Sequence, residues 1–198
     1  MSAPQVDADR RRVLAVAVLA ALPMPAARAQ PPADASSAIS FRGTPFMYRW
    51  SKAGQHEFTP ADSADLARWR DMLTLNVHPG VASGEQLAEV ANKTLANYQR
   101  AGKILQTRST PRTASRPAEH LIVAVLGTPD LLEAVFARCL LHDGAGLVAV
   151  VSHRVYGKAV GPQMSDWLRA NGPQLEQALM TWATLPSAVS LSRLPTSA

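Results

Sequence analysis

Two long stretches of the chain are aliphatic at nearly every position. Residues 120–127 (HLIVAVLG) and residues 146–157 (GLVAVVSHRVYG) each contain such a run. A strand with one solvated face alternates apolar and polar residues, whereas a strand covered on both faces gives a continuous apolar run. The pattern therefore predicts a sheet covered on both faces, with shorter strands at 46–51, 55–60 and 71–79.

The segment SGEQLAEVANKTLANYQRAG predicts an amphipathic helix over residues 84–101. Ser83 and Gln86 have the spacing of a capping box, in which each side chain accepts a hydrogen bond from the other residue's backbone amide. Apolar residues recur at intervals of three or four, and Gly102 stands where a glycine commonly ends a helix.

A second helical pattern runs through residues 161–186. Pro162 suits a first helical turn, and apolar residues from Met164 to Trp182 share one face. The tripeptide Asn171-Gly172-Pro173 interrupts this pattern, because proline lacks an amide donor and restricts the residue before it. We therefore predict a helix that is kinked or split at this point.

Residues 128–144 (TPDLLEAVFARCLLHDG) are compatible with two different structures. Thr128 and Pro129 are typical of a helix start, which would place a helix inside a β-α-β crossover at 120–156. The sequence HDGAG is equally typical of a hairpin loop, which would pair residues 131–141 antiparallel with 147–156.

The order of these segments resembles that of secreted bacterial proteins with a PsbP-like α/β/α sandwich. Trp69 stands before the strand motif Met72-Leu73-Thr74, and Asp143-Gly144 leads into a strand that ends near Arg154. The resemblance spans most of residues 46–157 and implies a fold but no catalytic residues. We therefore predict an α+β fold with a mainly antiparallel sheet flanked by helices; an α/β fold with the crossover is the alternative.

Residues 9–30 (DRRRVLAVAVLAALPMPAARAQ) have the parts of a cleavable export signal. The apolar run at 13–22 is too short for a transmembrane helix, which needs about 20 residues. Ala27-Arg28-Ala29 fits cleavage after Ala29. The pair Arg10-Arg11 resembles a twin-arginine signal, with an ordinary Sec signal as the alternative. The mature protein is therefore expected in the periplasm, without a membrane span.

Cleavage after Ala29 would remove four arginines and two aspartates, so the formal charge of +5 would fall to +3. Such a small excess does not call for a nucleic-acid partner. The proline-, alanine- and serine-rich residues 30–40 predict a flexible leader, and residues 187–198 predict a loose tail. Between them, residues 41–186 are expected to form a single globular domain.

Few patterns in the chain are typical of catalytic or metal sites. Cys139 is the only cysteine, so we expect a buried apolar side chain and no disulfide. His56-Glu57 lacks the second histidine that zinc proteases place four residues after the first. The chain has no GxSxG motif and no glycine-rich phosphate loop. We therefore predict no metal and no cofactor.

Three arginines are spaced through RSTPRTASR, residues 108–116. Guanidinium groups pair bidentately with carboxylate or phosphate, so Arg108, Arg112 and Arg116 are candidates for an anion clamp. The alternative is a solvated loop whose charges bind nothing specific.

The second candidate site lies where the strand containing SHRVYG becomes polar. Arg154 and Tyr156 should share one face of that strand, and His153 should lie on the other. The chain is therefore expected to be a non-enzymatic binding or accessory protein for an envelope protein or a small anionic ligand. The alternative is a hydrolase-type periplasmic enzyme whose site combines His153 and Arg154 with Glu119.

Overall fold

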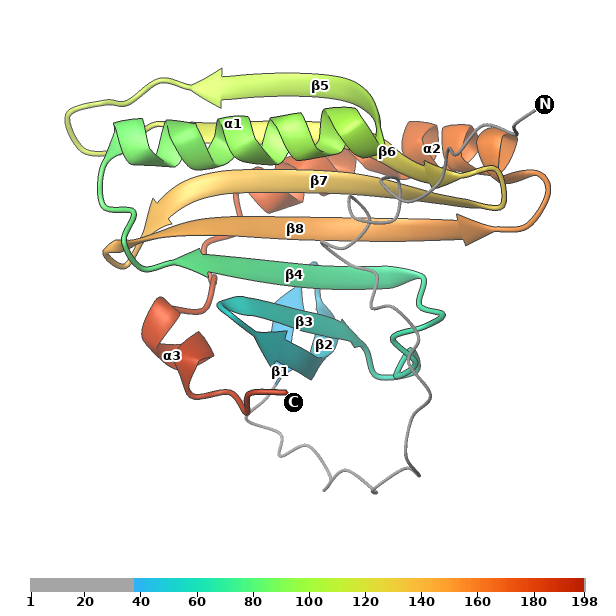
Figure 1. The fold of residues 1–198 in the computed structure, drawn as a ribbon, viewed down its shortest axis with the longest axis horizontal. Helices are drawn as coiled ribbons and strands as arrows, with labels where there is room; N and C mark the ends of the chain where they lie inside the picture. Colours follow the sequence, from blue (N-terminus) through green and yellow to red (C-terminus); the bar gives the residue numbers. More distant parts are fainter. Residues whose placement is uncertain (1–37, 198) are drawn as a thin grey trace, which may run out of the picture.

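The computed structural model describes residues 38–197, which form one eight-stranded antiparallel sheet with helices on both faces (Figure 1). The strands are β1 (Ala38–Phe41), β2 (Thr44–Lys52), β3 (Gln55–Pro60), β4 (Asp71–His78), β5 (Gly102–Thr110), β6 (Glu119–Thr128), β7 (Leu131–His142) and β8 (Ala145–Tyr156). The helices are α1 (Gly84–Ala101), α2 (Val160–Met180) and α3 (Ala188–Ser192). The predicted α+β class is confirmed.

The sheet consists of two meanders that meet at its centre. Its strand order is β1-β2-β3-β4-β8-β7-β6-β5, so β1–β4 and β5–β8 are joined where β4 pairs with β8. This pairing runs from Asp71 opposite His153 to His78 opposite Gly146. The connection from β4 to the far edge is made by α1, which packs on β5, β6 and β7 (Figure 1).

The segment that was compatible with helix or strand is strand β7. It pairs antiparallel with β8, from Leu131 opposite Tyr156 to His142 opposite Ala145, as the hairpin interpretation predicts. Residues 133–140 are buried on both faces of the sheet, which a helix with one apolar face would not achieve. The β-α-β alternative is therefore wrong.

Tight two-residue turns connect three of the hairpins. Arg42-Gly43, Ala53-Gly54 and Asp143-Gly144 all have positive φ at both positions. Turns of this kind match the right-handed twist of the strands they join, and they require residues that tolerate the left-handed region. Only the Asp143-Gly144 turn has the sequence of a strong hairpin signal, which is why the other two turns were not expected.

Helix α1 has the predicted bounds and capping box, with Ser83 accepting from the amide of Gln86 and the Gln86 side chain accepting from the amide of Ser83. Gly102 has a different role from the one expected. Its φ of 179° is extended, and it begins β5 instead of closing the helix in a left-handed conformation. A Cβ at this position would lie 2.1 Å from the carbonyl oxygen of Val125, so glycine permits a close approach to β6.

Helix α2 covers the opposite face of the sheet and packs on β7 and β8. It continues through Pro173 as a single helix, so the prediction of a split is wrong. Met164 lies before the proline and Leu175 and Leu179 lie after it, and all three are buried in one apolar cluster with Phe136 of β7. This shared packing holds both halves of the helix on the sheet despite the missing amide.

Both ends of the described chain are more ordered than predicted. Residues 38–40, expected in the leader, belong to β1, and Phe41 contacts Trp182 with ring centroids 4.9 Å apart. The expected loose tail contains α3, whose Leu191 is buried. The amide of Ser197 then donates to the carbonyl of Ser51, 2.7 Å away. A few leucines and one strand-like contact therefore suffice to dock the C-terminal segment.

The predicted export signal and cleavage site lie outside the described residues. Within residues 38–197, no helix is long and apolar enough to cross a membrane.

Candidate functional site

The structure distributes the predicted site residues over both faces of the sheet. His153 lies on the face that α2 covers, where it stacks on Trp167. Arg154 lies on the opposite face, together with Tyr156, as strand alternation predicts. Glu119 is on the α2 face at the start of β6, where it pairs with Arg138. The three residues of the enzyme alternative, His153, Arg154 and Glu119, therefore do not form one site.

His153 has a packing role in this structure. Its Nδ1 atom is 2.8 Å from a carboxylate oxygen of Asp71, its neighbour across the β4–β8 pairing. Its ring is parallel to that of Trp167 on α2, with centroids 4.0 Å apart. These contacts connect the centre of the sheet to α2. They give the imidazole a hydrogen-bond partner at Nδ1 and an aromatic ring on one face.

Glu119 is bound to Arg138 through both carboxylate oxygens, at 2.9 and 3.0 Å. The same guanidinium donates to the carbonyl oxygens of Leu179 and Trp182, at 2.9 and 3.3 Å. Those carbonyls belong to the end of α2 and the residues after it, where a cation is favoured by the helix dipole. The Glu119–Arg138 pair therefore anchors the C-terminus of α2.

The three arginines of the predicted anion clamp do not converge. Arg108 is in β5 and pairs with Glu176 on α2, with a nitrogen–oxygen distance of 2.8 Å. Arg112 acts on Glu85 at the start of α1; hydrogen bonds from its own amide and from Ser83, together with the charge of Arg112, lower the pKa of that carboxyl. Arg116 is exposed in the loop after β5. The loop is therefore not organised as a single clamp.

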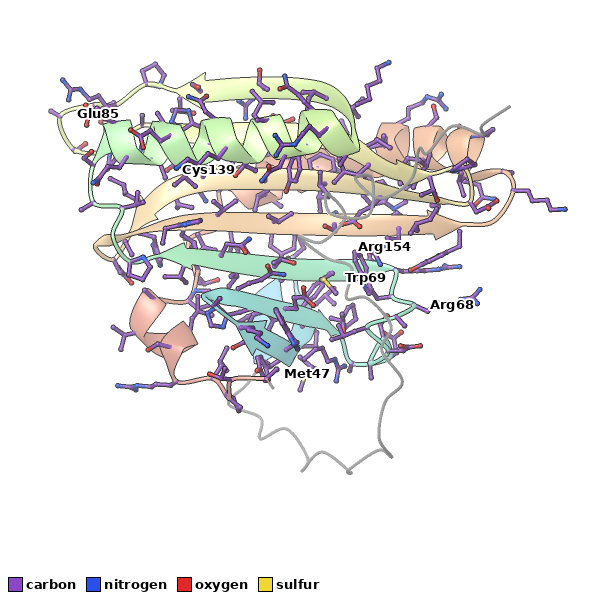
Figure 2. All side chains as sticks on the ribbon, viewed as in Figure 1. Met47, Arg68, Trp69, Glu85, Cys139 and Arg154 are labelled. Carbon is purple, nitrogen blue, oxygen red and sulfur yellow. The ribbon has the colours of Figure 1, made fainter. Side chains whose placement is uncertain are left out.

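Arg154 is the centre of a polar cluster on the α1 face, near the end of β8. Its Nε atom donates to Glu133 of β7 at 2.8 Å. Its guanidinium carbon lies 3.8 Å from the centroid of the Trp69 ring, a close cation–π contact. The hydroxyl of Tyr156 donates to the carbonyl of Trp69 at 2.7 Å and so fixes the loop before β4. Figure 2 shows Arg154 and Trp69 side by side, with Arg68 on the adjoining loop.

One donor of this cluster has no partner. The Arg154 side chain is only 5% exposed, and its Nη2 atom is buried without a hydrogen-bond partner. Buried charged donors are normally hydrogen-bonded, so an unsatisfied one calls for an explanation. We refer to Arg154, Glu133, Trp69, Tyr156 and Glu57 as the Arg154 cluster.

The acidic members of the Arg154 cluster differ in their electrostatics. Burial raises the pKa of Glu57, and it outweighs a hydrogen bond from Gln55 and the charge of Arg154, which lower that pKa. Glu133 is in direct contact with Arg154 and is therefore its main counter-charge. Outside the ion pair, Arg68 and Arg70 are exposed on either side of Trp69 in the chain, and the guanidinium carbon of Arg68 lies 5.7 Å from the centroid of the Tyr156 ring.

Sequence reasoning identified Arg154 and Tyr156 but missed Glu133 and Glu57. Glu133 is the only charged residue in the first half of an apolar strand. A lone charge in such a run indicates a buried ion pair, so the sequence could have identified Glu133 as a candidate. Its partner could be identified only from the register that places it opposite Arg154. Glu57 reaches the same face through the β3–β4 pairing, where it lies opposite Thr74.

Two more observations on the described residues concern the cysteine and metal binding. Burial raises the pKa of the Cys139 thiol to about 12, so it stays protonated and packs as a small apolar group, as expected. Among residues 38–197, no three histidine, cysteine, aspartate or glutamate side chains gather as a metal site would require.

No family model and no curated protein matches the chain. Among solved structures, the chain is similar to PA94 of Pseudomonas aeruginosa, a protein of unknown function, at 13% sequence identity and a TM-score of 0.43. The alignment covers 76% of this chain and 97% of PA94.

Proposed function

We propose that this protein is an exported, non-enzymatic binding protein that takes up a small carboxylate-bearing compound at the Arg154 cluster. The observation that carries this proposal is the buried and unsatisfied Nη2 donor of Arg154. A ligand carboxylate would supply the missing acceptor in a charge-assisted hydrogen bond, which is stronger than a neutral one.

The surroundings of Arg154 favour an anionic group on an aromatic or apolar body. Arg68 and Arg70 lie exposed on either side of Trp69, and basic groups at a rim raise the local concentration of anions. Trp69 is buried against the guanidinium, and the half-buried Tyr156 provides aromatic surface beside that loop. Burial raises the pKa of Glu57 from its usual value, which weakens the preference of this carboxyl for the charged form.

The wider features of the chain support the same proposal. The arrangement of helices on both faces of an antiparallel sheet is compatible with a PsbP-like α/β/α sandwich. Residues 9–30 have the composition of an export signal, so we infer that the protein acts in the periplasm. In that compartment the ligand would be a soluble metabolite or an acidic group on an envelope component.

The test uses benzoate as a probe and benzamide as its neutral isostere. In ¹⁵N-resolved NMR spectra, benzoate is expected to shift the Arg154 Nε–H and Trp69 indole resonances, and benzamide is not. Replacing Arg154 by glutamine should weaken benzoate binding at least about tenfold, the effect of losing a hydrogen bond to a charged group. Arg169→Gln, which alters an exposed arginine paired with Asp166, is the matched control and should bind as wild type does.

Arg154→Gln leaves Glu133 buried without its partner, so that variant can lose stability. The double variant Arg154→Gln/Glu133→Gln removes both charges and keeps the binding test valid. The proposal is rejected if benzoate shifts neither resonance up to its solubility, or if the double variant binds benzoate as tightly as wild type does.

A further inference from the structure

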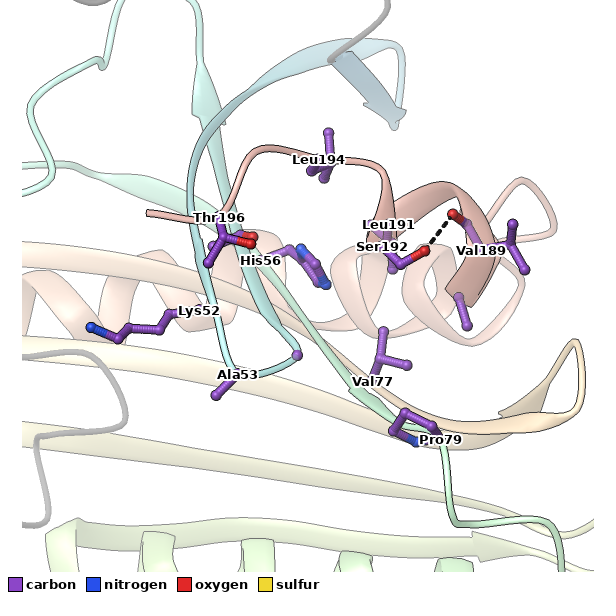
Figure 3. Close-up of a pocket in the computed structure, with 13 residues that line it drawn as sticks. Lys52, Ala53, His56, Val77, Pro79, Val189, Leu191, Ser192, Leu194 and Thr196 are labelled. Carbon is purple, nitrogen blue, oxygen red and sulfur yellow. Dashed lines mark hydrogen bonds between the residues drawn. The ribbon is translucent and has the colours of Figure 1, made fainter. Parts of the chain in front are cut away.

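A cavity of about 380 Å³ lies at the end of the sheet where the C-terminal segment packs (Figure 3). The β2–β3 hairpin forms one wall, the end of β4 with Val77 and Pro79 forms the floor, and α3 forms the other wall. Cavities that hold small molecules commonly start at about 300 Å³. This cavity is therefore large enough for a compact organic ligand.

The lining is mostly apolar, and its polar members are His56, Lys52, Ser51, Ser192 and Thr196. Val77, Pro79, Leu191 and Leu194 supply apolar surface, and Figure 3 shows the ring of His56 among them. His56 is 6% exposed, and its Nδ1 atom is buried without a hydrogen-bond partner. Burial also lowers the pKa of His56, so the ring is neutral at pH 7 and above. A histidine with an unsatisfied nitrogen beside a mostly apolar cavity suits a ligand with a matching polar group.

The α3 wall is held in place by contacts at the end of the chain. The hydroxyl of Tyr48 and that of Ser51 both donate to the carbonyl of Pro195. The amide of Ser51 in turn donates to the side chain of Ser197 at 3.1 Å. Within α3, the side chain of Ser192 donates to the carbonyl of Val189 (dashed line in Figure 3). These hydrogen bonds tie the segment after α3 to β2.

We propose that this cavity binds a small, largely apolar molecule with one hydroxyl group, and that the hydroxyl bonds to the imidazole of His56. A hydroxyl can donate or accept, so it satisfies either tautomer of a neutral imidazole. A carboxylate is disfavoured, because burying it without a cation is costly and Figure 3 shows Lys52 directed away from His56.

This site is separate from the Arg154 cluster. His56 is opposite Leu75 in the β3–β4 pairing and therefore faces the α2 side of the sheet. Its neighbour Glu57 faces the other side, toward Arg154. The two proposals can therefore fail independently, since each is read from residues on a different face.

The test compares 2-naphthol with 2-methylnaphthalene, which replaces the hydroxyl by a methyl group. Both are titrated into the full chain at pH 7.5, and methyl resonances of Val77, Leu191 and Leu194 report binding. In wild type, 2-naphthol should bind more tightly than 2-methylnaphthalene. This preference, measured as the ratio of the two dissociation constants, should fall about fivefold in His56→Phe. His56→Gln keeps a hydrogen-bonding group and should retain most of the wild-type preference.

A second pair of variants tests the location of the site. Ser192→Trp places a large side chain at a lining position and should abolish binding of both compounds. Arg193→Trp adds the same side chain at the neighbouring exposed position and should leave binding intact. The proposal is overturned by an unchanged ratio in His56→Phe, by binding that survives Ser192→Trp, or by no methyl shifts for either compound.

Discussion

At the scale of single residues, the Glu119–Arg138 pair is the charged contact on which we expect stability to depend most. Replacing Arg138 by methionine leaves Glu119 buried without its partner and removes the guanidinium donor from the carbonyls of Leu179 and Trp182. We expect the free energy of unfolding to fall by about 3–5 kcal/mol, the usual cost of breaking a buried ion pair on one side. Urea denaturation followed by circular dichroism measures this loss.

The double variant Arg138→Met/Glu119→Leu provides the control for that prediction. Removing both charges should restore much of the stability that the single variant loses, because no unpaired charge remains buried. If Arg138→Met is as stable as wild type, the pair does not anchor α2 as the geometry indicates.

Residue types alone predicted which side chains are polar in apolar surroundings but not what they bind. Glu119 and Arg154 were both selected as candidate site residues from their positions at strand ends. The first is satisfied by Arg138, 19 residues away, whereas the second keeps a free donor despite Glu133. That difference depends on strand register, which the sequence around each residue does not encode.

At the scale of elements, two glycines should respond differently to alanine substitution. Gly172 lies inside α2, and beyond its chain neighbours a Cβ there would meet only the edge of Phe136 at 3.8 Å, an ordinary contact. Pro173 crowds a Cβ on the helical residue before it, which offsets the helical advantage of alanine, so Gly172→Ala should change the stability of the protein by less than about 1 kcal/mol. Gly102→Ala should destabilise it, because the added Cβ would clash with the backbone of Val125. Thermal unfolding of the two variants provides the comparison.

Periodicity predicted the elements well where one pattern was unambiguous. The bounds of α1 agree with the prediction, because its capping box and apolar spacing indicate the same helix. Strand β5 was missed, because Gly102–Thr110 is an edge strand with mostly exposed side chains and lacks an apolar run. Pro173 was overweighted, because tertiary packing on β7 stabilises a helix that local rules would break.

At the scale of the whole molecule, the end of the chain completes the core. Leu191 is buried beside residues of β2, β3 and β4 in one apolar cluster. Truncation after Pro186 should therefore lower the free energy of unfolding by at least about 2 kcal/mol, the value of burying one leucine. Val189→Ala alters a residue of the same helix that is 61% exposed, and its stability should stay within about 0.5 kcal/mol of wild type.

The global topology required information beyond local patterns. The sequence predicted a sheet covered on two faces and a hairpin at 131–156, and both are present. It did not show that β4 pairs with β8 at the centre of the sheet, because these strands are far apart in the chain and both are apolar. The docked tail was also missed, because its leucines are few and lie among polar residues.

The central β4–β8 pairing also affects the order in which the sheet can form. While the chain is being made, β1 to β4 can assemble locally, but the outer edge of β4 stays open until β8 emerges about 70 residues later. An open edge strand is a template for pairing with other chains. The nascent protein therefore passes through a stage in which half of the sheet has an unpaired edge that can aggregate. That stage ends only when β8 pairs with β4.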